Sequence, residues 1–69
     1  MKKFQISLSA ARVNAGLTQE EVSAKMHISK TTLVNWEKGK VAPSFASLQV
    51  LSNLYSIPID NIFLPPQST

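Results

Sequence analysis

The stretch that decides the fold runs from Leu17 to Gly39 and reads LTQEEVSAKMHISKTTLVNWEKG. Thr18 and Glu21 form a capping-box pattern: the Thr hydroxyl accepts a hydrogen bond from the backbone N–H three residues later, and the Glu carboxylate accepts one from the Thr N–H. Gly16 lies just before this pattern and suits the positive φ of a helix end. The pattern therefore predicts that one helix ends and another begins within three residues.

A further helix is predicted after a short turn. Val22 and Met26 are four residues apart, so they share the inward face of the helix that Thr18 caps. Ser29 is a second N-cap candidate, and Gly39 is a natural C-terminal stop. The next helix is therefore expected to span about residues 30–38.

A helical wheel of residues 30–38 separates an inward stripe from an outward face. Leu33 and Trp36 define the inward stripe, and Ser29 and Glu37 lie beside it. The outward face presents hydroxyl, amide, ammonium and branched apolar groups, all of which can contact base edges in the DNA major groove. Its residues are Thr31, Val34, Asn35 and Lys38, flanked by Lys30 and Thr32. The pattern favours two helices joined by a turn, of which the second enters DNA.

Length and composition restrict the other classes of protein. The chain has 69 residues, no Cys and one His. A single small domain is expected, and because neither disulfides nor zinc can hold it together, its stability must come from helix packing, assisted by dimerisation. The sequence lacks a Gly-rich phosphate loop and a spaced carboxylate pair. We therefore expect no enzyme activity, no catalytic residue, no metal site and no cofactor.

The positive charges are placed where a nucleic-acid contact would need them. Lys30, Lys38 and Lys40 lie in or just after the expected third helix, whereas Arg12 and Lys25 lie on the two helices before it. On charge alone, an ordinary solvated surface is an equal alternative. The sequence shows no continuous apolar run of the kind that a signal peptide or membrane span requires, so a soluble, cytoplasmic protein without a membrane partner is expected.

Caps and periodicity predict two more helices. The first is expected from residue 7 or 8 to residue 15, with Leu8 and Ala11 facing inward. Ser44 caps the fourth, which continues to about residue 55. The inward stripe of this fourth helix is expected to hold Phe45, Leu48, Leu51, Ser52 and Tyr55. Val50 and Leu54 fall on a different side, where they either pack beneath a last helix or form a subunit contact.

The C-terminal part is expected to hold a fifth helix. Pro58 suits the first turn of a short helix over residues 59–63, and no strand is expected anywhere in the chain. The fold class predicted from these patterns is all-α, with five helices in one domain over residues 1–64. Residues 65–69 are expected to form a disordered tail.

From about Leu8 to Leu64 the chain resembles the phage-repressor-like helix-turn-helix family, the XRE or Cro type of transcriptional regulator. The resemblance implies a compact five-helix, lambda-repressor-like fold that binds operator DNA, usually as a dimer. Two residues depart from the family pattern: His27 stands where Gly is preferred, and Ser23 stands where Ala is common. The residues that carry the resemblance are Leu17-Thr18-Gln19, Val22, Met26, Ile28, Leu33, Trp36-Glu37, Gly39, Pro43 and Ile57-Pro58-Ile59-Asp60-Asn61-Ile62-Phe63.

The resemblance also implies roles for single residues. Arg12 and Glu37 are implied to form an ion pair within the fold, and Gln19 is implied to contact a phosphate from a helix N-terminus, which favours an anion. Base contacts are implied for Lys30, Thr31 and Asn35, with Val34 beside them. Phosphate contacts are expected from Gln19, Ser29, Thr32, Lys38 and Lys40.

Two functional classes follow. The leading one is a sequence-specific DNA-binding transcriptional regulator, expected to repress as a homodimer on an inverted-repeat operator in double-stranded DNA. The alternative is an antitoxin-like or adaptor module that keeps the fold and binds protein, because a fold alone does not fix a function. The polar, cationic face of residues 30–38 argues against the second class, since a protein-binding surface would more commonly carry aromatic side chains there.

Overall fold

Four helices form most of the chain in the computed structural model, which describes residues 4–65. They are α1 (Leu8–Asn14), α2 (Gln19–Met26), α3 (Lys30–Lys38) and α4 (Phe45–Tyr55). A 3-10 turn, η1 (Ile59–Asn61), follows α4, and two short strands, β1 (Ile6–Ser7) and β2 (Ile62–Phe63), pair with each other. Residues 66–69, most of the expected tail, lie outside the described range.

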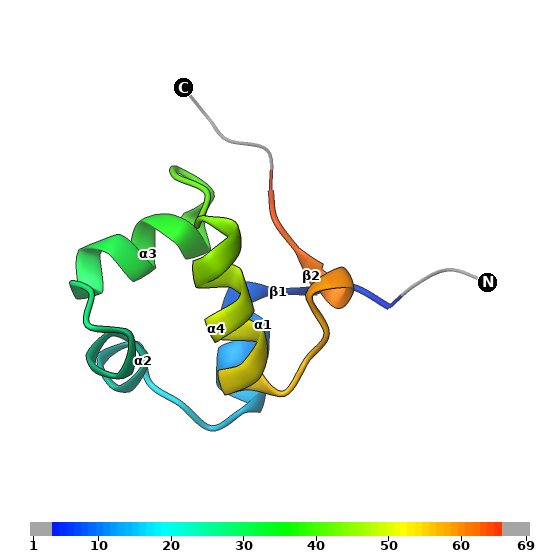
Figure 1. Ribbon diagram of the computed structural model, residues 1–69, viewed down its shortest axis with the longest axis horizontal. Helices are drawn as coiled ribbons and strands as arrows, with labels where there is room; N and C mark the ends of the chain where they lie inside the picture. Colours follow the sequence, from blue (N-terminus) through cyan, green and yellow to red (C-terminus); the bar gives the residue numbers. More distant parts are fainter. Residues whose placement is uncertain (1–3, 66–69) are drawn as a thin grey trace.

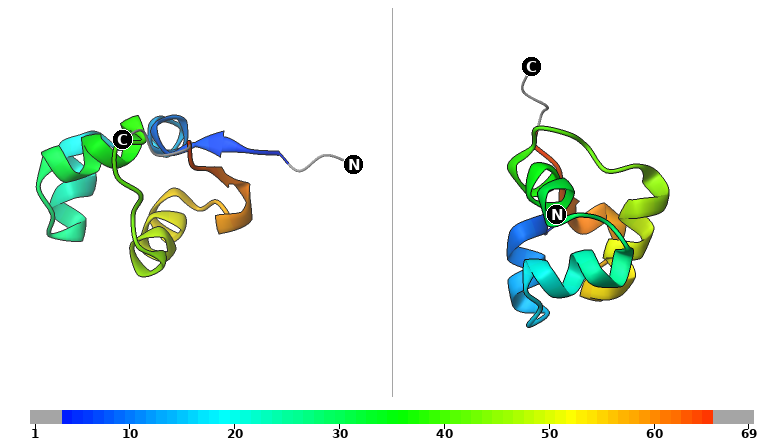
Figure 2. Two further views of the ribbon diagram at one scale, coloured as in Figure 1. Left: turned by 90° about the horizontal axis from the view of Figure 1, so that it is seen from above. Right: turned by 90° about the vertical axis from the view of Figure 1, so that its left-hand side faces the viewer.

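The helices enclose one core between two layers. α4 crosses α1, and the left view of Figure 2 shows α1 and β1 on one side with α4 on the other. The pair α2 and α3 forms the end of the molecule opposite β1 and β2 (Figure 1). As a result, α3 lies at an edge, where one of its sides packs on α1 and α2 while the other faces away from the body.

All four helices begin in the same way. In each, the hydroxyl of the N-cap residue accepts a hydrogen bond from the backbone N–H three residues later, at 3.0–3.1 Å. Such caps satisfy one of the donors that a helix start leaves unpaired. The capping residues are Ser7, Thr18, Ser29 and Ser44. The predicted caps at Thr18, Ser29 and Ser44 are confirmed, and Thr18 forms the full capping box with Glu21.

Three of the helices end on a residue with left-handed backbone geometry. Gly39 ends α3 with φ 79°, where its missing Cβ removes the steric cost of positive φ. His27 ends α2 with φ 57°, and Ser56 ends α4 with φ 54°. These two residues are not glycines, so each adopts a conformation that L-residues disfavour.

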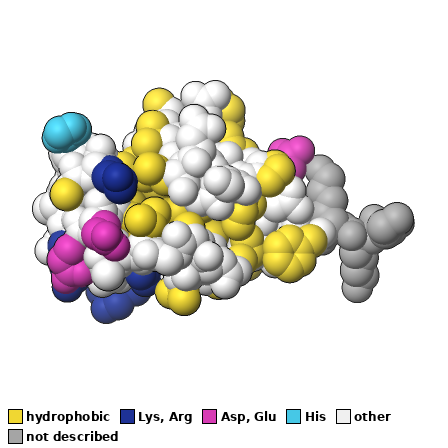
Figure 3. Space-filling model, turned by 90° about the horizontal axis from the view of Figure 1, so that it is seen from below, with side chains coloured by type: hydrophobic (Ala, Val, Ile, Leu, Met, Phe, Trp, Pro, Cys, Tyr) yellow, Lys and Arg dark blue, Asp and Glu magenta, His cyan; other side chains and the backbone are white. Residues whose placement is uncertain are grey.

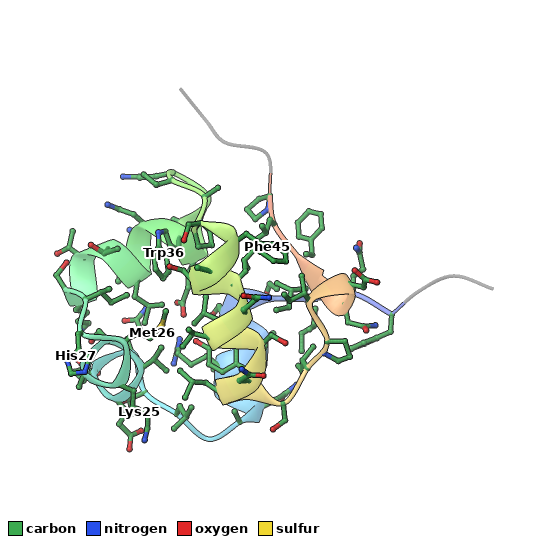
Figure 4. The ribbon with its side chains drawn as sticks, in the orientation of Figure 1. Lys25, Met26, His27, Trp36 and Phe45 are labelled. Carbon is green, nitrogen blue, oxygen red and sulfur yellow. The ribbon has the colours of Figure 1, made fainter. Side chains whose placement is uncertain are left out.

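The core is built from the inward faces of all four helices and from both strands. Leu33 of α3, Leu51 of α4 and Val22 of α2 are its largest fully buried side chains. Trp36 is also buried and lies between α3 and α4 (Figure 4), which confirms its predicted core position. Met26 and Leu54 pack against this core from its margin.

The predicted fifth helix is wrong, and so is the expectation that the chain holds no strand. Of the residues predicted to form it, 59–63, only Ile59–Asn61 is helical, as a 3-10 turn. The chain then forms β2, which pairs in parallel with β1: Ile62 lies opposite Ile6, and Phe63 lies opposite Ser7. The Asn61 side-chain amide also donates to the carbonyl of Phe4. Burial of Ile6 and Ile62 in the core favours the extended pairing over another helical turn.

One detail of the helix faces differs from the prediction, and the alternatives left open for Val50 and Leu54 have a different outcome for each residue. Phe45, expected inside, is 66% exposed, because it occupies the first position of α4 where the helix has passed the edge of the core. Val50 is exposed as well, whereas Leu54 packs against the core. The first helix ends one residue early, at Asn14, with Leu8 and Ala11 buried as expected.

Candidate nucleic-acid interface

The outward face of α3 is uncovered. Lys30, Thr31 and Lys38 are exposed, and Val34 and Asn35 are half-buried. Because residues three and four apart are neighbours on a helix, Thr31, Val34 and Asn35 lie together in the middle of this face. The structure thus brings the four residues expected to contact bases onto one accessible surface.

Hydroxyl groups organise the first turn of α3. The Ser29 hydroxyl accepts from the Thr32 backbone N–H at 3.1 Å and shares a second hydrogen bond with the Thr32 hydroxyl at 2.9 Å. Two of the residues expected to contact phosphates are therefore adjacent at the start of α3. Both hydroxyls take part in this local contact, although each retains further hydrogen-bonding capacity for a ligand.

The other end of α3 carries two cations. Lys38 is the last residue of the helix, and the Lys40 backbone N–H folds back to donate to the carbonyl of Asn35 at 3.0 Å. Both side chains are exposed, and within residues 4–65 neither takes part in an ion pair. This end of α3 therefore presents positive charge that the described part of the protein does not neutralise.

Gln19, the first residue of α2, is held by the fold. Its amide Nε2 donates to Glu37 Oε1 at 2.9 Å, across the junction between α2 and α3. The side chain is half-buried, and its amide oxygen is not used in this contact. Gln19 lies at a helix N-terminus as expected, but its contact with Glu37 was not predicted, because it depends on how α2 packs against α3.

Arg12 and Glu37 join α1 to α3. Arg12 Nε donates to Glu37 Oε2 at 2.8 Å, and Arg12 Nη1 donates to the carbonyl of Leu17 at 3.0 Å. The Arg12 and Glu37 side chains are 13% and 6% exposed. Since Glu37 also accepts from Gln19, one carboxylate fixes α1, α2 and α3 relative to one another. We call Arg12 and Glu37 the clamp, because together they hold the three helices in place beneath the outward face of α3.

Tyr55 of α4 is buried close to this clamp. Burial and, to a smaller extent, the nearby Glu37 carboxylate raise the pKa of its phenol to about 12, while Arg12 opposes the shift. Its hydroxyl has no hydrogen-bond partner within the described part of the chain. The neutral phenol is therefore strongly favoured in the folded state.

Both departures from the family pattern, one within α2 and one at its end, fit the structure. His27 adopts left-handed backbone geometry, which Gly adopts without strain, and is exposed at the outer edge of the molecule (Figure 4). Ser23 is buried, and its hydroxyl donates to the carbonyl of Glu20 at 3.1 Å. Because the side chain is small and its hydroxyl has a hydrogen-bond partner within α2, Ser23 can be buried in the core.

A second ion pair connects the first turns of α2 and α3. Lys30 Nζ donates to Glu20 Oε2 at 2.7 Å, and this hydrogen bond lowers the pKa of the Glu20 carboxyl. Figure 3 shows acidic and basic side chains side by side at the end of the molecule that holds α2 and α3. Sequence reasoning missed this pair because ten residues and a turn separate its members.

Other kinds of site are not found in the described part of the chain. Residues 4–65 hold no group of three or more potential metal ligands. In the same range, no helix has the length and hydropathy needed to cross a membrane. The outward face of α3, with Gln19 at the start of α2, holds the residues expected from the sequence to contact DNA.

Comparison with known proteins shows to which family the chain belongs. A family model described as helix-turn-helix matches residues 8–62, which include all four helices. The chain belongs to the helix-turn-helix family. In helix-turn-helix terms, α2 and α3 are the two helices of the motif, and residues 27–29 form its turn. The resemblance expected from the sequence is thereby confirmed.

Three curated helix-turn-helix relatives are similar over most of this chain. The transcriptional activator BcrR of Enterococcus faecalis is 33% identical over 60 residues, the transcriptional regulator ImmR of Bacillus subtilis is 40% identical over 53, and the cryptic phage CTXphi transcriptional repressor RstR of Vibrio cholerae is 32% identical over 56. The matches cover 87%, 77% and 81% of this chain, but only 29%, 42% and 50% of these relatives. No solved structure matches the chain.

Proposed function

We propose that this protein is a sequence-specific DNA-binding transcriptional regulator that inserts α3 into the major groove of an operator. The observation that carries the proposal is the uncovered outward face of α3, where Thr31, Val34 and Asn35 lie between Lys30 at one end and Lys38 at the other. An amide can make a bidentate contact to adenine, and an apolar side chain can pack on a thymine methyl. Lys30, Thr31, Val34 and Asn35 are the proposed base-contacting residues.

Phosphate contacts are proposed on both sides of this face. Gln19 and the hydroxyls of Ser29 and Thr32 lie at helix starts, where backbone N–H groups and the helix dipole favour an anion. Lys38 and Lys40 supply charge at the far end of α3. Such contacts fix the orientation of a protein on the duplex without reading its sequence.

Selection of bound duplexes from a random library tests the proposal. A regulator of this kind enriches a defined motif, and its affinity falls steeply with salt because phosphate contacts release counterions. The alternative, a protein-interaction module, enriches no motif. A purified protein that binds no duplex at low ionic strength would refute the proposal.

We further propose that the protein acts as a homodimer on an inverted repeat and represses by occupying it. Two copies of α3 must then enter the groove roughly 34 Å apart, one helical turn of DNA. Val41 and Phe45 support the dimer, because they are exposed apolar residues that follow the C-terminal end of α3. Ile57 and Leu64 pack against the core, so we do not assign the subunit contact to them. A cytoplasmic location belongs to this same proposal.

Two measurements test the dimer and the direction of regulation. The solution mass of the complex with a selected duplex should equal two chains per inverted repeat, whereas a single chain per site would contradict the dimer. A reporter gene placed behind the selected motif should lose expression when the protein is present. Increased expression would show activation instead.

A further inference from the structure

The ion pair between Glu20 and Lys30 places a carboxylate at the edge of the candidate interface. The two side chains are 67% and 53% exposed, so neither is buried by the fold. Exposed ion pairs of this kind contribute little to stability, because water screens the two charges. The pair therefore does little to hold the fold together. Because Lys30 begins α3, the pair can instead affect which groups of a ligand this helix contacts.

Lys30 is the residue whose contacts this carboxylate controls. An ammonium has three N–H donors, and Glu20 takes one of them, which leaves two for a ligand. Guanine presents two adjacent acceptors in the major groove, N7 and O6, whereas adenine and thymine each present one acceptor there. The two remaining donors of Lys30 therefore match guanine better than any other base.

Glu20 adds an acceptor directly beside those donors. The Lys30 Nζ and Glu20 Oε2 atoms are 2.7 Å apart. In a G·C pair, guanine O6 and the cytosine amine are joined by a hydrogen bond of roughly 2.9 Å, so their spacing is similar. A carboxylate can accept from that amine while the ammonium donates to O6. The ion pair is thus complementary to the major-groove edge of one G·C pair.

The same carboxylate disfavours contacts that carry no sequence information. A phosphate that approached Lys30 would also approach Glu20, whose exposed carboxylate is ionised at neutral pH. The repulsion weakens binding of Lys30 to the DNA backbone, and specificity rises when the wrong contact is made unfavourable.

We propose that Glu20 is a specificity-determining residue of the DNA contact: it orients Lys30 toward guanine, accepts from the paired cytosine, and repels phosphate from Lys30. The proposal rests on the proposed function, because it assigns a role within the same DNA-binding surface. In this proposal, Glu20 and Lys30 together contact one G·C base pair in each half-site.

The test compares duplex selection by the full chain, by Glu20→Gln and by Glu21→Gln. Glu21 is the matched control: it belongs to the same helical turn, its replacement changes the charge equally, and Gln also serves in a capping box. Glu20→Gln should reduce the preference for G·C over A·T at one position about tenfold, while Glu21→Gln retains that preference. Lys30→Ala should erase preference at the same position.

Each outcome separates the two proposals. If the unchanged chain enriches a motif but Glu20→Gln and Glu21→Gln select the same base at every position, the role of Glu20 is refuted while the DNA-binding function stands. If the unchanged chain enriches no motif, the proposed function itself fails. A loss of preference that is equal in both Gln variants would show an effect of net charge and would also refute the role.

Discussion

Arg12 Nε lies 2.8 Å from Glu37 Oε2, and this contact links the helix that begins the domain to the end of the helix proposed to read DNA. Glu37 also accepts from Gln19 of α2. A single carboxylate therefore holds three helices in the relative positions that expose the outward face of α3. Its effect on function is indirect, through the placement of that face.

Removing one member of this pair should be costly. Arg12→Ala leaves Glu37 buried without its charged partner, and loss of one member of a buried pair costs about 3–5 kcal/mol. The free energy of unfolding from urea denaturation measures the effect. Lys25→Ala is the control, since Lys25 is an exposed cation of α2 outside the clamp. A loss below about 1 kcal/mol for Arg12→Ala would show that the clamp does not stabilise the fold.

Tyr55 should make the stability of the fold fall at high pH. Its pKa is about 12 in the folded protein and about 10 for an ordinary phenol, so the stabilising difference is fully present below pH 10. As pH rises from about 10 to 12, the unfolded chain releases this proton more readily and stability falls by up to about 3 kcal/mol. Urea denaturation at a series of pH values measures the loss.

Tyr55→Phe is the control for this pH dependence. The two proteins differ in this phenol alone, so the difference between the two profiles isolates Tyr55. The variant also removes a buried hydroxyl that has no partner within residues 4–65, so its stability at pH 7 should change by no more than about 1 kcal/mol. Parallel profiles for the two proteins from pH 9 to 12 would contradict the shifted pKa.

Glycine should be tolerated or favoured at the end of α2. His27 holds φ 57°, a conformation that costs an L-residue about 1–2 kcal/mol, whereas Gly adopts it freely but loses more entropy on folding. His27→Gly should therefore keep or raise the melting temperature. Ser56→Gly tests the same argument at the end of α4. A clear fall in both melting temperatures would refute it.

The helix ends of this fold can be predicted from the sequence, because they depend on local capping residues. The start and end of α3 follow from Ser29 and Gly39, because capping depends on residues within one turn of the helix end. The pairing of β1 with β2 could not be predicted in this way. It joins Ile6 to Ile62 across nearly the whole chain, and each strand has only two residues, too few to show alternation.

The same distinction between local features and long-range contacts applies to the candidate site. The wheel places Thr31 and Asn35 on the outward face because that face depends only on helical spacing. The contacts of Gln19 with Glu37 and of Glu20 with Lys30 depend on how α2 packs against α3, so the local pattern carries no signal for them. The outward positions of Thr31 and Asn35 are therefore predictable from helical spacing, whereas the partners of Gln19 and Glu20 are not.

Asn35 and Gln19 should fail in different ways when each is replaced by Ala. Asn35→Ala removes a proposed base contact, so it should cost about 1–3 kcal/mol on the preferred duplex and relax preference at one position. Gln19→Ala removes a proposed phosphate contact and should weaken binding to all duplexes alike. Affinities for the preferred and a scrambled duplex, measured at one salt concentration, distinguish the two. Because Gln19 also donates to Glu37, the melting temperature of its variant must be shown to exceed the assay temperature. Equal losses on both duplexes for both variants would refute the division between base and phosphate contacts.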